Sequence, residues 1–175
     1  MEYSVRLATV DDAAEIAVAH VASWKAAYRG LLPDQMLDSL SVTERQGRIS
    51  NILADLGPRS AFLVATRAHA VAGFAWIGPQ RCAVRAEHDG ELYSIYLHPD
   101  HWGHGIGHRL HHAALARLHD HGFTTAILWV LNGNERAINF YRRTGWRESG
   151  ASRVDTRPDG TELPETQFQR VVVQP

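Results

Sequence analysis

Three glycines at alternate positions are the residues whose type and spacing most clearly suggest chemistry: Gly103, Gly105 and Gly107. An alternating, mostly apolar segment, 91–97, precedes them, and an amphipathic helical pattern begins at Ile106. Glycines let a backbone approach a phosphate closely, and unpaired N–H groups at a helix N-terminus point toward an anion. The order of strand, glycine loop and helix therefore predicts a site for a phosphorylated ligand, although a simple turn uses the same residues.

The spacing of the glycines separates this loop from two other phosphate-binding loops. The Gly-x-x-x-x-Gly-Lys-Ser/Thr pattern of a P-loop is absent, and the glycines lie too close together for the dinucleotide fingerprint. Residues 102–107 instead resemble the acyl-CoA loop of the GCN5-related N-acetyltransferases (the GNAT superfamily), Gln/Arg-x-x-Gly-x-Gly/Ala. Trp102 occupies the position where that pattern has Gln or Arg.

A second segment, 132–146, resembles another motif of the same family, Asn-x-x-Ala-Ile-x-Phe/Leu-Tyr-x-x-x-Gly-Phe. It follows the apolar run 126–131, which has the pattern of a buried strand. Two motifs in the expected order indicate the family far more strongly than either one alone. The resemblance covers roughly residues 1–150 and is strongest over 91–146.

The resemblance implies acetyl-CoA as the cofactor. The end of strand 91–97 would bond the pantetheine amides through free backbone groups, and the glycine loop would bind the pyrophosphate. The second motif would contact the cofactor through Asn134. The spacing leaves Arg142 and Arg143 as equal candidates for the 3′-phosphate. The other implied cofactor-binding residues are Ile95, Tyr96, Leu97, Gly103, His104, Gly105, Ile106, Gly107, His108 and Asn134.

Tyr141 is the residue that the resemblance implies beside the cofactor sulfur. Asn134 lies seven residues before it, close to two helical turns, so both residues are expected on one side of a helix. A departing thiolate needs a proton, and a phenol has a pKa near that of an alkyl thiol. We therefore expect Tyr141 to be the general acid, with simple packing against the cofactor as the alternative.

Glu91 is the candidate general base. Side chains alternate along a strand, so Glu91, Tyr93, Ile95 and Leu97 are expected to share one face. In the histone-modifying branch of the family a carboxylate at the equivalent position is the base, and desolvation in an apolar strand suits a carboxylate for proton transfer. Recognition of the substrate amine, and no role in the reaction, stay open as alternatives.

Trp24 and Tyr28 are four residues apart and share one face of a predicted helix. The stretch 23–33 around them resembles one GNAT subgroup of presumed small-molecule acetyltransferases, in which the first two helices border the acceptor site. The resemblance therefore implies that Trp24 or Tyr28 binds the substrate. The alternative is that both are aromatic residues of the core.

The helix after the glycine loop is rich in histidine, and eight of the eleven histidines of the chain lie between 98 and 121. His104, His108 and His112 recur every four residues, but no third zinc ligand and no His-Glu-x-x-His motif accompany them, so we expect no metal. Imidazolium groups at 104 and 108 would instead attract the pyrophosphate. Solvated histidines on an exposed helix face are the alternative.

The remaining patterns describe one α/β domain over 1–175, large enough for a substantial core. We expect a twisted, mostly antiparallel sheet of about seven strands with helices on both faces, as the resemblance implies. Strand patterns cover 4–8, 61–66, 71–77, 91–97 and 126–131, with two more between 146 and 173; helical patterns start near 9–12 and 33, span about 43–56, and follow both motifs.

Composition limits the partners. The formal net charge is −1, so nucleic acid is not expected, and no apolar run is long enough to span a membrane. No signal peptide is apparent, and a cytoplasmic protein is the expectation. The single cysteine, Cys82, cannot form a disulfide within one chain and is expected to be a loop or core thiol rather than a nucleophile.

Together these features predict an N-acetyltransferase that transfers an acetyl group from acetyl-CoA to a primary amine of a small molecule. The amine would attack the thioester directly, and a backbone N–H near Leu97 would polarise its carbonyl. Acetylation of a protein N-terminus or lysine is the alternative within enzymes. An acyl-CoA-binding sensor without turnover is the alternative of another class. The resemblance also implies a homodimer.

Overall fold

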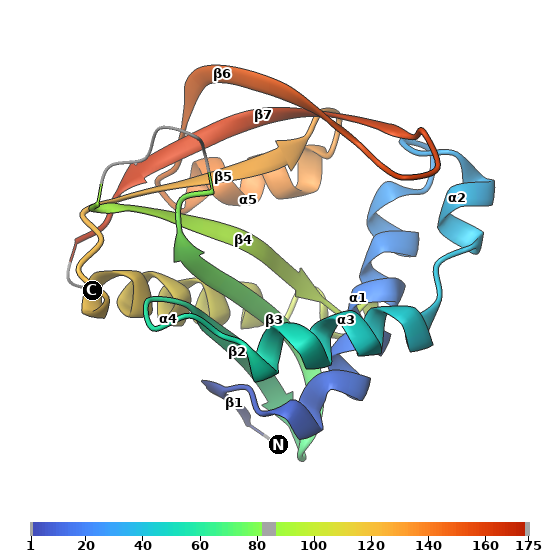
Figure 1. The fold of residues 1–175 in the computed structure, drawn as a ribbon, viewed down its shortest axis with the longest axis horizontal. Helices are drawn as coiled ribbons and strands as arrows, with labels where there is room; N and C mark the ends of the chain where they lie inside the picture. The colour runs from blue at the N-terminus through green and yellow to red at the C-terminus, as the bar shows by residue number, and fades with distance from the viewer. Residues whose placement is uncertain (1, 82–86, 174–175) are drawn as a thin grey trace.

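The computed structural model describes residues 2–81 and 87–173, which form a seven-stranded sheet in the order β1-β2-β3-β4-β5-β7-β6 (Figure 1). All neighbouring strands are antiparallel except β4 and β5, which are parallel. This confirms the predicted fold class. The strands are β1 (Tyr3–Leu7), β2 (Ala61–Arg67), β3 (Ala70–Pro79), β4 (Asp89–Leu97), β5 (Thr125–Leu131), β6 (Arg147–Thr156) and β7 (Glu162–Val171).

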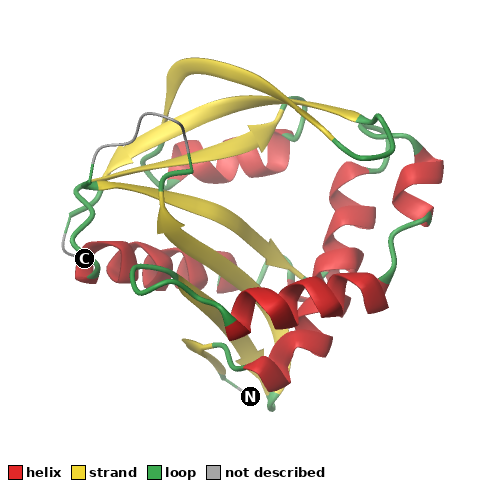
Figure 2. Ribbon diagram, in the orientation of Figure 1, coloured by secondary structure: helices red, strands yellow, loops and turns green. Residues whose placement is uncertain are grey.

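Five α-helices connect these strands and cover both faces of the sheet (Figure 2). Two 3₁₀ turns, Val10–Asp12 and Pro99–His101, precede α1 and the glycine loop. The helices are α1 (Ala13–Tyr28), α2 (Asp34–Asp38), α3 (Val42–Ala54), α4 (Ile106–Asp120) and α5 (Glu135–Arg143).

Local sequence accounts for several element ends. The Thr9 N–H donates to the Asp12 carboxylate at 2.7 Å, as expected for a helix start at Thr9. The Ser41 hydroxyl accepts from the Glu44 N–H and begins α3. Strands β2 and β3, at the strand patterns 61–66 and 71–77, form a hairpin, and its two turn residues, Ala68 and His69, both have positive φ. Such angles match the twist of a two-residue hairpin.

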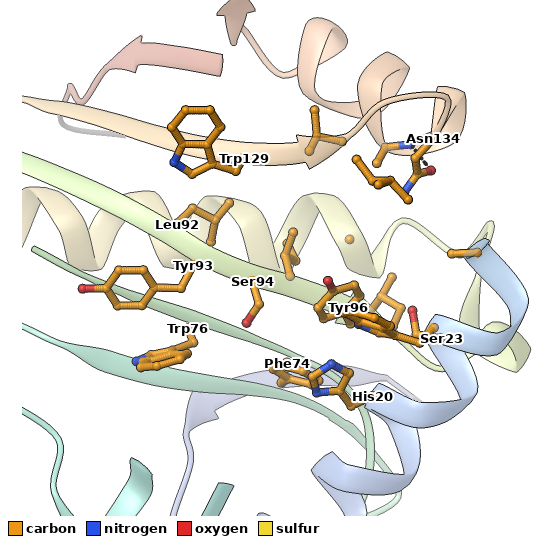
Figure 3. Close-up of a pocket in the computed structure, with 18 of the residues that line it drawn as sticks. His20, Ser23, Phe74, Trp76, Leu92, Tyr93, Ser94, Tyr96, Trp129 and Asn134 are labelled. Atoms are coloured by element: carbon orange, nitrogen blue, oxygen red, sulfur yellow. Dashed lines mark hydrogen bonds between the residues drawn. The ribbon is translucent and has the colours of Figure 1, made fainter. Parts of the chain in front are cut away.

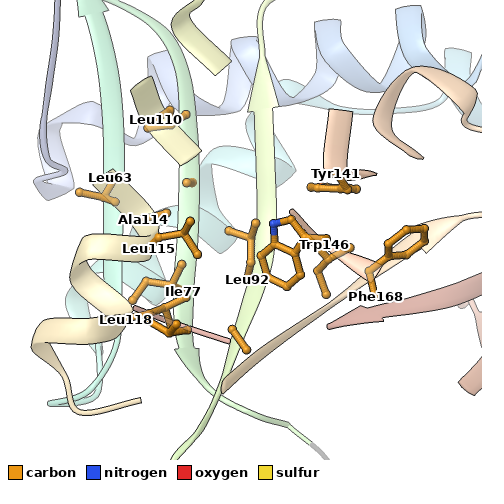
Figure 4. Close-up of a cluster of buried hydrophobic side chains, with 14 of the residues drawn as sticks. Leu63, Ile77, Leu92, Leu110, Ala114, Leu115, Leu118, Tyr141, Trp146 and Phe168 are labelled. Carbon is orange, nitrogen blue, oxygen red and sulfur yellow. The ribbon is translucent and has the colours of Figure 1, made fainter. Parts of the chain in front are cut away.

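The largest core cluster lies between α4 and the central strands (Figure 4). Ile106, Leu110 and Leu118 are almost fully buried there, as the helical periodicity predicts. On the opposite face, α1 and α3 pack against β2 and β3 around Ile16, Phe62 and Phe74. Burying each large apolar side chain contributes roughly 1.5–3 kcal/mol, so α4 and α1 are held firmly on their two faces.

The parallel strands β4 and β5 separate after a short contact. They pair only where Asp89, Gly90 and Glu91 face Thr125, Ala126 and Ile127, and beyond that point Figure 1 shows them diverging. This divergence leaves free backbone groups at the end of segment 91–97, as the resemblance implies. Among the described residues, no strand pairs with the edge of β4 that faces β5 from Leu92 onward.

The strand β4 contains a β-bulge that overturns one sequence prediction. Trp76 pairs with Ser94 but Ile77 pairs with Leu92, so Tyr93 is the extra residue. An extra residue reverses the alternation of side chains beyond it. Leu92, Ile95 and Leu97 consequently face α4, whereas Tyr93, Ser94 and Tyr96 face the side of α1 and α3.

The prediction that Glu91, Tyr93, Ile95 and Leu97 share one face was therefore wrong. A Cβ at Gly90 would lie 2.7 Å from Leu118 of α4, which puts Gly90 and Leu92 on the α4 face and Glu91 between them on the other. Glu91 thus faces the same side as Tyr93, while Ile95 and Leu97 face α4.

The remaining sequence predictions concern membrane helices, Cys82 and the last two strands. Within residues 2–81 and 87–173, no helix is long and apolar enough to cross a membrane. Cys82, expected to be a loop or core thiol, lies outside the described residues. The two strands predicted after Trp146 are present as β6 and β7, joined by a turn at 157–161.

Candidate active site

A cavity of about 1170 Å³ opens where β4 and β5 diverge. Its lining includes residues of α1, α3 and α5, the glycine loop and the β6–β7 hairpin. In Figure 3 the side chains of Tyr96, Ser94 and Tyr93 on β4 lie below Trp129 on β5, with α1 at one end. A cavity of this size accommodates a large cofactor together with a small second substrate.

The glycine loop closes one end of this cavity. Gly103 and Gly105 have φ of +82° and +74°, and a Cβ on either would meet no atom within 4 Å. The glycines are thus required by backbone conformation, and they leave the N-terminus of α4 open to a ligand. Gly103, Gly105, Ile106, Gly107 and His108 line the cavity; His104 is exposed beside it.

Trp102 ties the loop to the splayed strand. Its indole N–H donates a 2.9 Å hydrogen bond to the Leu97 carbonyl oxygen. His98, which follows Leu97 in the chain, donates its backbone N–H to the Ala72 carbonyl oxygen of β3. The peptide groups of successive residues alternate in direction along a strand. The peptide groups of Ile95 and Leu97 therefore face the opening toward β5, where a ligand could take the place of a partner strand.

Asn134 and Tyr141 bracket α5 and both line the cavity. Asn134 is the N-cap of the helix, because its side-chain oxygen accepts from the Ala137 N–H at 3.2 Å; its amide N–H₂ group is thereby left for other partners. Tyr141 is 8% exposed and lies near Trp146 and Phe168 (Figure 4). Burial raises the pKa of Tyr141 well above its usual value, so its hydroxyl is protonated at neutral pH.

Glu91 is buried in the cavity wall and paired with one arginine. Its Oε2 accepts from the Arg81 backbone N–H at 2.8 Å, and its Oε1 accepts from the Arg81 guanidinium at 2.9 Å. Only 2% of the residue is exposed. This pairing fixes the carboxylate, and sequence reasoning missed it because Arg81 lies across a sheet register rather than at a local spacing.

Trp24 and Tyr28 belong both to the buried core and to the cavity wall. Their rings meet edge-on at 4.9 Å, and the Tyr28 and Tyr96 hydroxyls lie 3.2 Å apart. Burial raises the pKa of Tyr28 well above its usual value. The two alternatives weighed for Trp24 and Tyr28 are therefore compatible: each side chain packs with one edge and borders the cavity with another.

Several lining residues could not be recognised from the sequence. Arg136 of α5 lies 3.6 Å from the Trp102 ring centre, and Arg45 of α3 and Arg157 of the β6–β7 turn lie 6.0 and 5.0 Å from the Trp24 ring centre. His20 stacks on Tyr96 at 4.9 Å. Arg136 occupies a variable position of the second motif, and neither motif includes Arg45, Arg157 or His20. Only the helical spacing of His20 and Trp24 hinted at a shared surface.

Comparison with known proteins places this geometry in a family. The family model described as "Acetyltransferase (GNAT) family" matches residues 22–146. An uncharacterized N-acetyltransferase of Bacillus subtilis (strain 168), YuaI, is 32% identical over 139 residues, which span 79% of this chain and 77% of that protein.

Solved structures show the same fold. The PaiA N-acetyltransferase from Thermoplasma acidophilum, in complex with coenzyme A, superposes with a TM-score of 0.72 at 19% identity, covering 98% of this chain and 99% of that one. A ribosomal-protein-alanine N-acetyltransferase from Brucella melitensis gives a TM-score of 0.70 at 26% identity, covering 96% of this chain and 99% of that one.

Proposed function

The chain belongs to the GNAT family and is an acetyl-CoA-dependent N-acetyltransferase, and from this premise we propose that its acceptor is the primary amine of a small molecule. The amine attacks the thioester directly, without a covalent acyl-enzyme. The cofactor lies between β4 and β5, with its pyrophosphate at the glycine loop and its thioester near Tyr141.

The proposed cofactor contacts follow from the groups that face the opening. The peptide groups of Ile95 and Leu97 bond the pantetheine amides, while Tyr96 between them directs its side chain to the acceptor side. The backbone N–H groups of 103–107 and the α4 N-terminus bind the pyrophosphate, as the positive φ of Gly103 and Gly105 permits. The free amide N–H₂ group of Asn134 donates to the pantetheine arm.

In the proposed reaction, the neutral amine nitrogen bonds to the thioester carbon while a backbone N–H near Leu97 stabilises the oxyanion. Collapse of the tetrahedral intermediate breaks the C–S bond, and the departing thiolate takes the Tyr141 hydroxyl proton. The proton lost by the amine passes to Glu91, directly or through water, and Arg81 holds this carboxylate in place. Tyr141 is returned to its acid form by solvent after the products leave.

One observation carries the choice of a small acceptor. Arg157, from the turn between β6 and β7, lies over Trp24 of α1 at 5.0 Å, so the hairpin covers the helix that borders the acceptor side. Trp24, Tyr28 and Phe74 are each less than 8% exposed. An aromatic pocket that the hairpin covers suits a compact amine, whereas an extended peptide needs an open groove.

Acetylation of a protein N-terminus is the second candidate. It is favoured by the likeness to the ribosomal-protein-alanine N-acetyltransferase, at 26% identity over nearly the whole chain. The two candidates differ in the size of acceptor that the space beneath the β6–β7 hairpin must admit, so competing substrates can separate them.

The test is a transfer assay that follows CoA release with small primary amines and with short peptides bearing a free N-terminal Ala. A kcat/KM for small amines at least tenfold higher than for any peptide supports the proposal. A preference for peptides overturns it. Glu91→Gln, with Glu87→Gln in the same region as its control, is expected to lower kcat about 10²-fold, since general base catalysis contributes roughly 10²–10⁴.

A further inference from the structure

The cavity carries more arginine than its own carboxylates neutralise. Among the described residues that line it, seven are arginines and three are carboxylates. Glu91 pairs with Arg81 at 2.9 Å and Glu165 pairs with Arg153 at 2.7 Å. The third carboxylate, Asp155, forms a 3.7 Å ion pair with the Nε of Arg157, too long for a hydrogen bond.

Part of this excess lies away from the glycine loop, on the acceptor side. Arg45 of α3 and Arg157 of the β6–β7 turn approach the same ring, that of Trp24, at 6.0 and 5.0 Å. Arg45 forms no ion pair with any described residue, and burial together with the charges of Arg48 and Arg157 lowers its pKa. Two cations thus lie near each other around one buried indole, without a full complement of negative charge.

Buried polar atoms without a hydrogen-bond partner accompany these cations. The Nε of Arg157 is buried and has no hydrogen-bond partner among the described residues, and the same holds for Nε2 of His20. Burial, followed by the charges of Arg45 and Arg157, lowers the pKa of His20, so its ring is neutral and provides no opposing or additional charge. Buried donors without partners cost stability unless a ligand satisfies them.

We propose that Arg45 and Arg157 form an anion subsite of the acceptor pocket, so that the acceptor is a primary amine that also carries a carboxylate or phosphate group. This rests on the proposed function and narrows its substrate class. The aromatic wall of Trp24, Phe74 and Tyr96 favours an apolar, preferably aromatic, body between the amine and the anion.

The two arginines act on such a substrate in two ways. They bind its anionic group through charge-assisted hydrogen bonds, for which the planar guanidinium is well suited. Their positive charge also disfavours an ammonium ion nearby, so they increase the neutral fraction of the amine that must attack the thioester. A purely cationic amine gains neither effect and is repelled.

The first experiment compares matched acceptors in the transfer assay: L-phenylalanine against L-phenylalaninamide and 2-phenylethylamine, and O-phosphoethanolamine against ethanolamine. We expect kcat/KM for an anionic member to exceed that of its neutral or cationic partner by about tenfold or more, as one charge-assisted contact implies. The carboxylate and phosphate arms identify which anion is preferred. Equal or better turnover of the partners that lack the anionic group overturns the anion subsite.

Variants test the two arginines. R45Q and R157Q are expected to raise KM for the anionic acceptor about tenfold or more and to leave the KM for acetyl-CoA unchanged; R147Q, on the exposed start of β6, is the control. Retention of the anion preference in both variants contradicts the assignment. Thermal melting with acetyl-CoA reports whether each variant is folded and binds the cofactor.

A binding experiment keeps the inference testable without turnover. In the presence of CoA, calorimetry compares N-acetyl-L-phenylalanine with N-acetyl-2-phenylethylamine. Tighter binding of the anionic compound to the wild type, lost in R45Q, supports the subsite; absence of that preference overturns it. Failure of acetyl-CoA to bind or to react with any amine would instead contradict the proposed function, so the two failures are distinguishable.

Discussion

The guanidinium carbon of Arg136 lies 3.6 Å from the centre of the Trp102 ring, and Trp102 in turn donates its indole N–H to the Leu97 carbonyl oxygen. These contacts join the first turn of α5 to the glycine loop and to the splayed end of β4. Trp102 stands where the family pattern has Gln or Arg, and Arg136 brings a cation to that position from another helix.

Arg136→Ala is therefore expected to weaken CoA binding by roughly tenfold, because one charge-assisted contact to a phosphate contributes about 1.5–3 kcal/mol. Calorimetry at two ionic strengths checks this, and the variant should also show a shallower salt dependence. Arg147→Ala provides the control. Unchanged affinity in folded Arg136→Ala would mean that the arginine only packs on Trp102.

Arg142 and Arg143, which the sequence could not separate, differ in the structure. The Arg142 guanidinium is held by Glu148 at 2.7 Å, whereas Arg143 lines the cavity. We expect Arg143→Ala to reduce the preference for CoA over 3′-dephospho-CoA about fivefold or more, and Arg142→Ala to preserve it. Competitive binding of the two ligands gives both ratios. A loss confined to Arg142→Ala would reverse the assignment.

Tyr141→Phe is expected to lower kcat about 10²-fold with little change in the KM for acetyl-CoA, since a general acid acts on the leaving thiolate and not on cofactor binding. Burial raises the pKa of Tyr141 well above its usual value, so the acid form persists throughout the neutral and mildly alkaline range. The pH–rate profile should accordingly show no decline below about pH 10 from this residue. Full turnover by the variant would support a packing role.

His104 and His108 flank the N-terminus of α4, where both are exposed. A positive charge on either imidazole attracts the pyrophosphate, so the double variant with Gln at both positions is expected to bind CoA more weakly. Exposed charges contribute modestly, and a change of roughly threefold is expected. Calorimetry measures both affinities, with His119→Gln as the control. Unchanged affinity in the double variant would contradict the role.

Sequence-based prediction succeeded for features that residues close in the chain determine and failed for features that depend on residues far apart. The glycine loop, the α5 motif and the helix starts are determined by residues close in the chain, and all three lie where they were expected. The side-chain directions on β4 were wrong beyond Leu92, because the bulge at Tyr93 depends on pairing with β3 and has no local signature.

The charged features of the cavity depend on longer separations. Arg81 meets Glu91 across the β3–β4 register, and Arg45 and Arg157 approach Trp24 from a helix and a hairpin more than a hundred residues apart. The composition does not indicate these contacts, because the formal net charge of −1 is a sum in which acidic residues elsewhere offset the basic cavity. Packing of the elements was required to reveal them.

A buried hydrogen bond between His111 of α4 and Trp146 leads to a prediction about stability. The Trp146 indole N–H donates to Nε2 of His111 at 2.8 Å, and His111 is 4% exposed. Burial, followed by the charge of Arg170, lowers the pKa of His111 to about 4. The folded protein therefore keeps the ring neutral at a pH where the unfolded chain, with its ordinary pKa near 6.5, binds a proton.

Between about pH 6.5 and pH 4 the unfolded state binds more protons, so the free energy of unfolding falls as the pH decreases, by at most about 1.4 kcal/mol per pH unit for this residue. Burial lowers the pKa of His20 as well, so His20 adds a similar dependence of the free energy of unfolding on pH. His111→Gln retains an acceptor for Trp146 and should remove the contribution of one proton. Urea unfolding of wild type and variant between pH 4.5 and 7.5 measures the difference, with His112→Gln on the exposed face of α4 as the control; identical slopes in all three proteins would show that His111 does not stay neutral on folding.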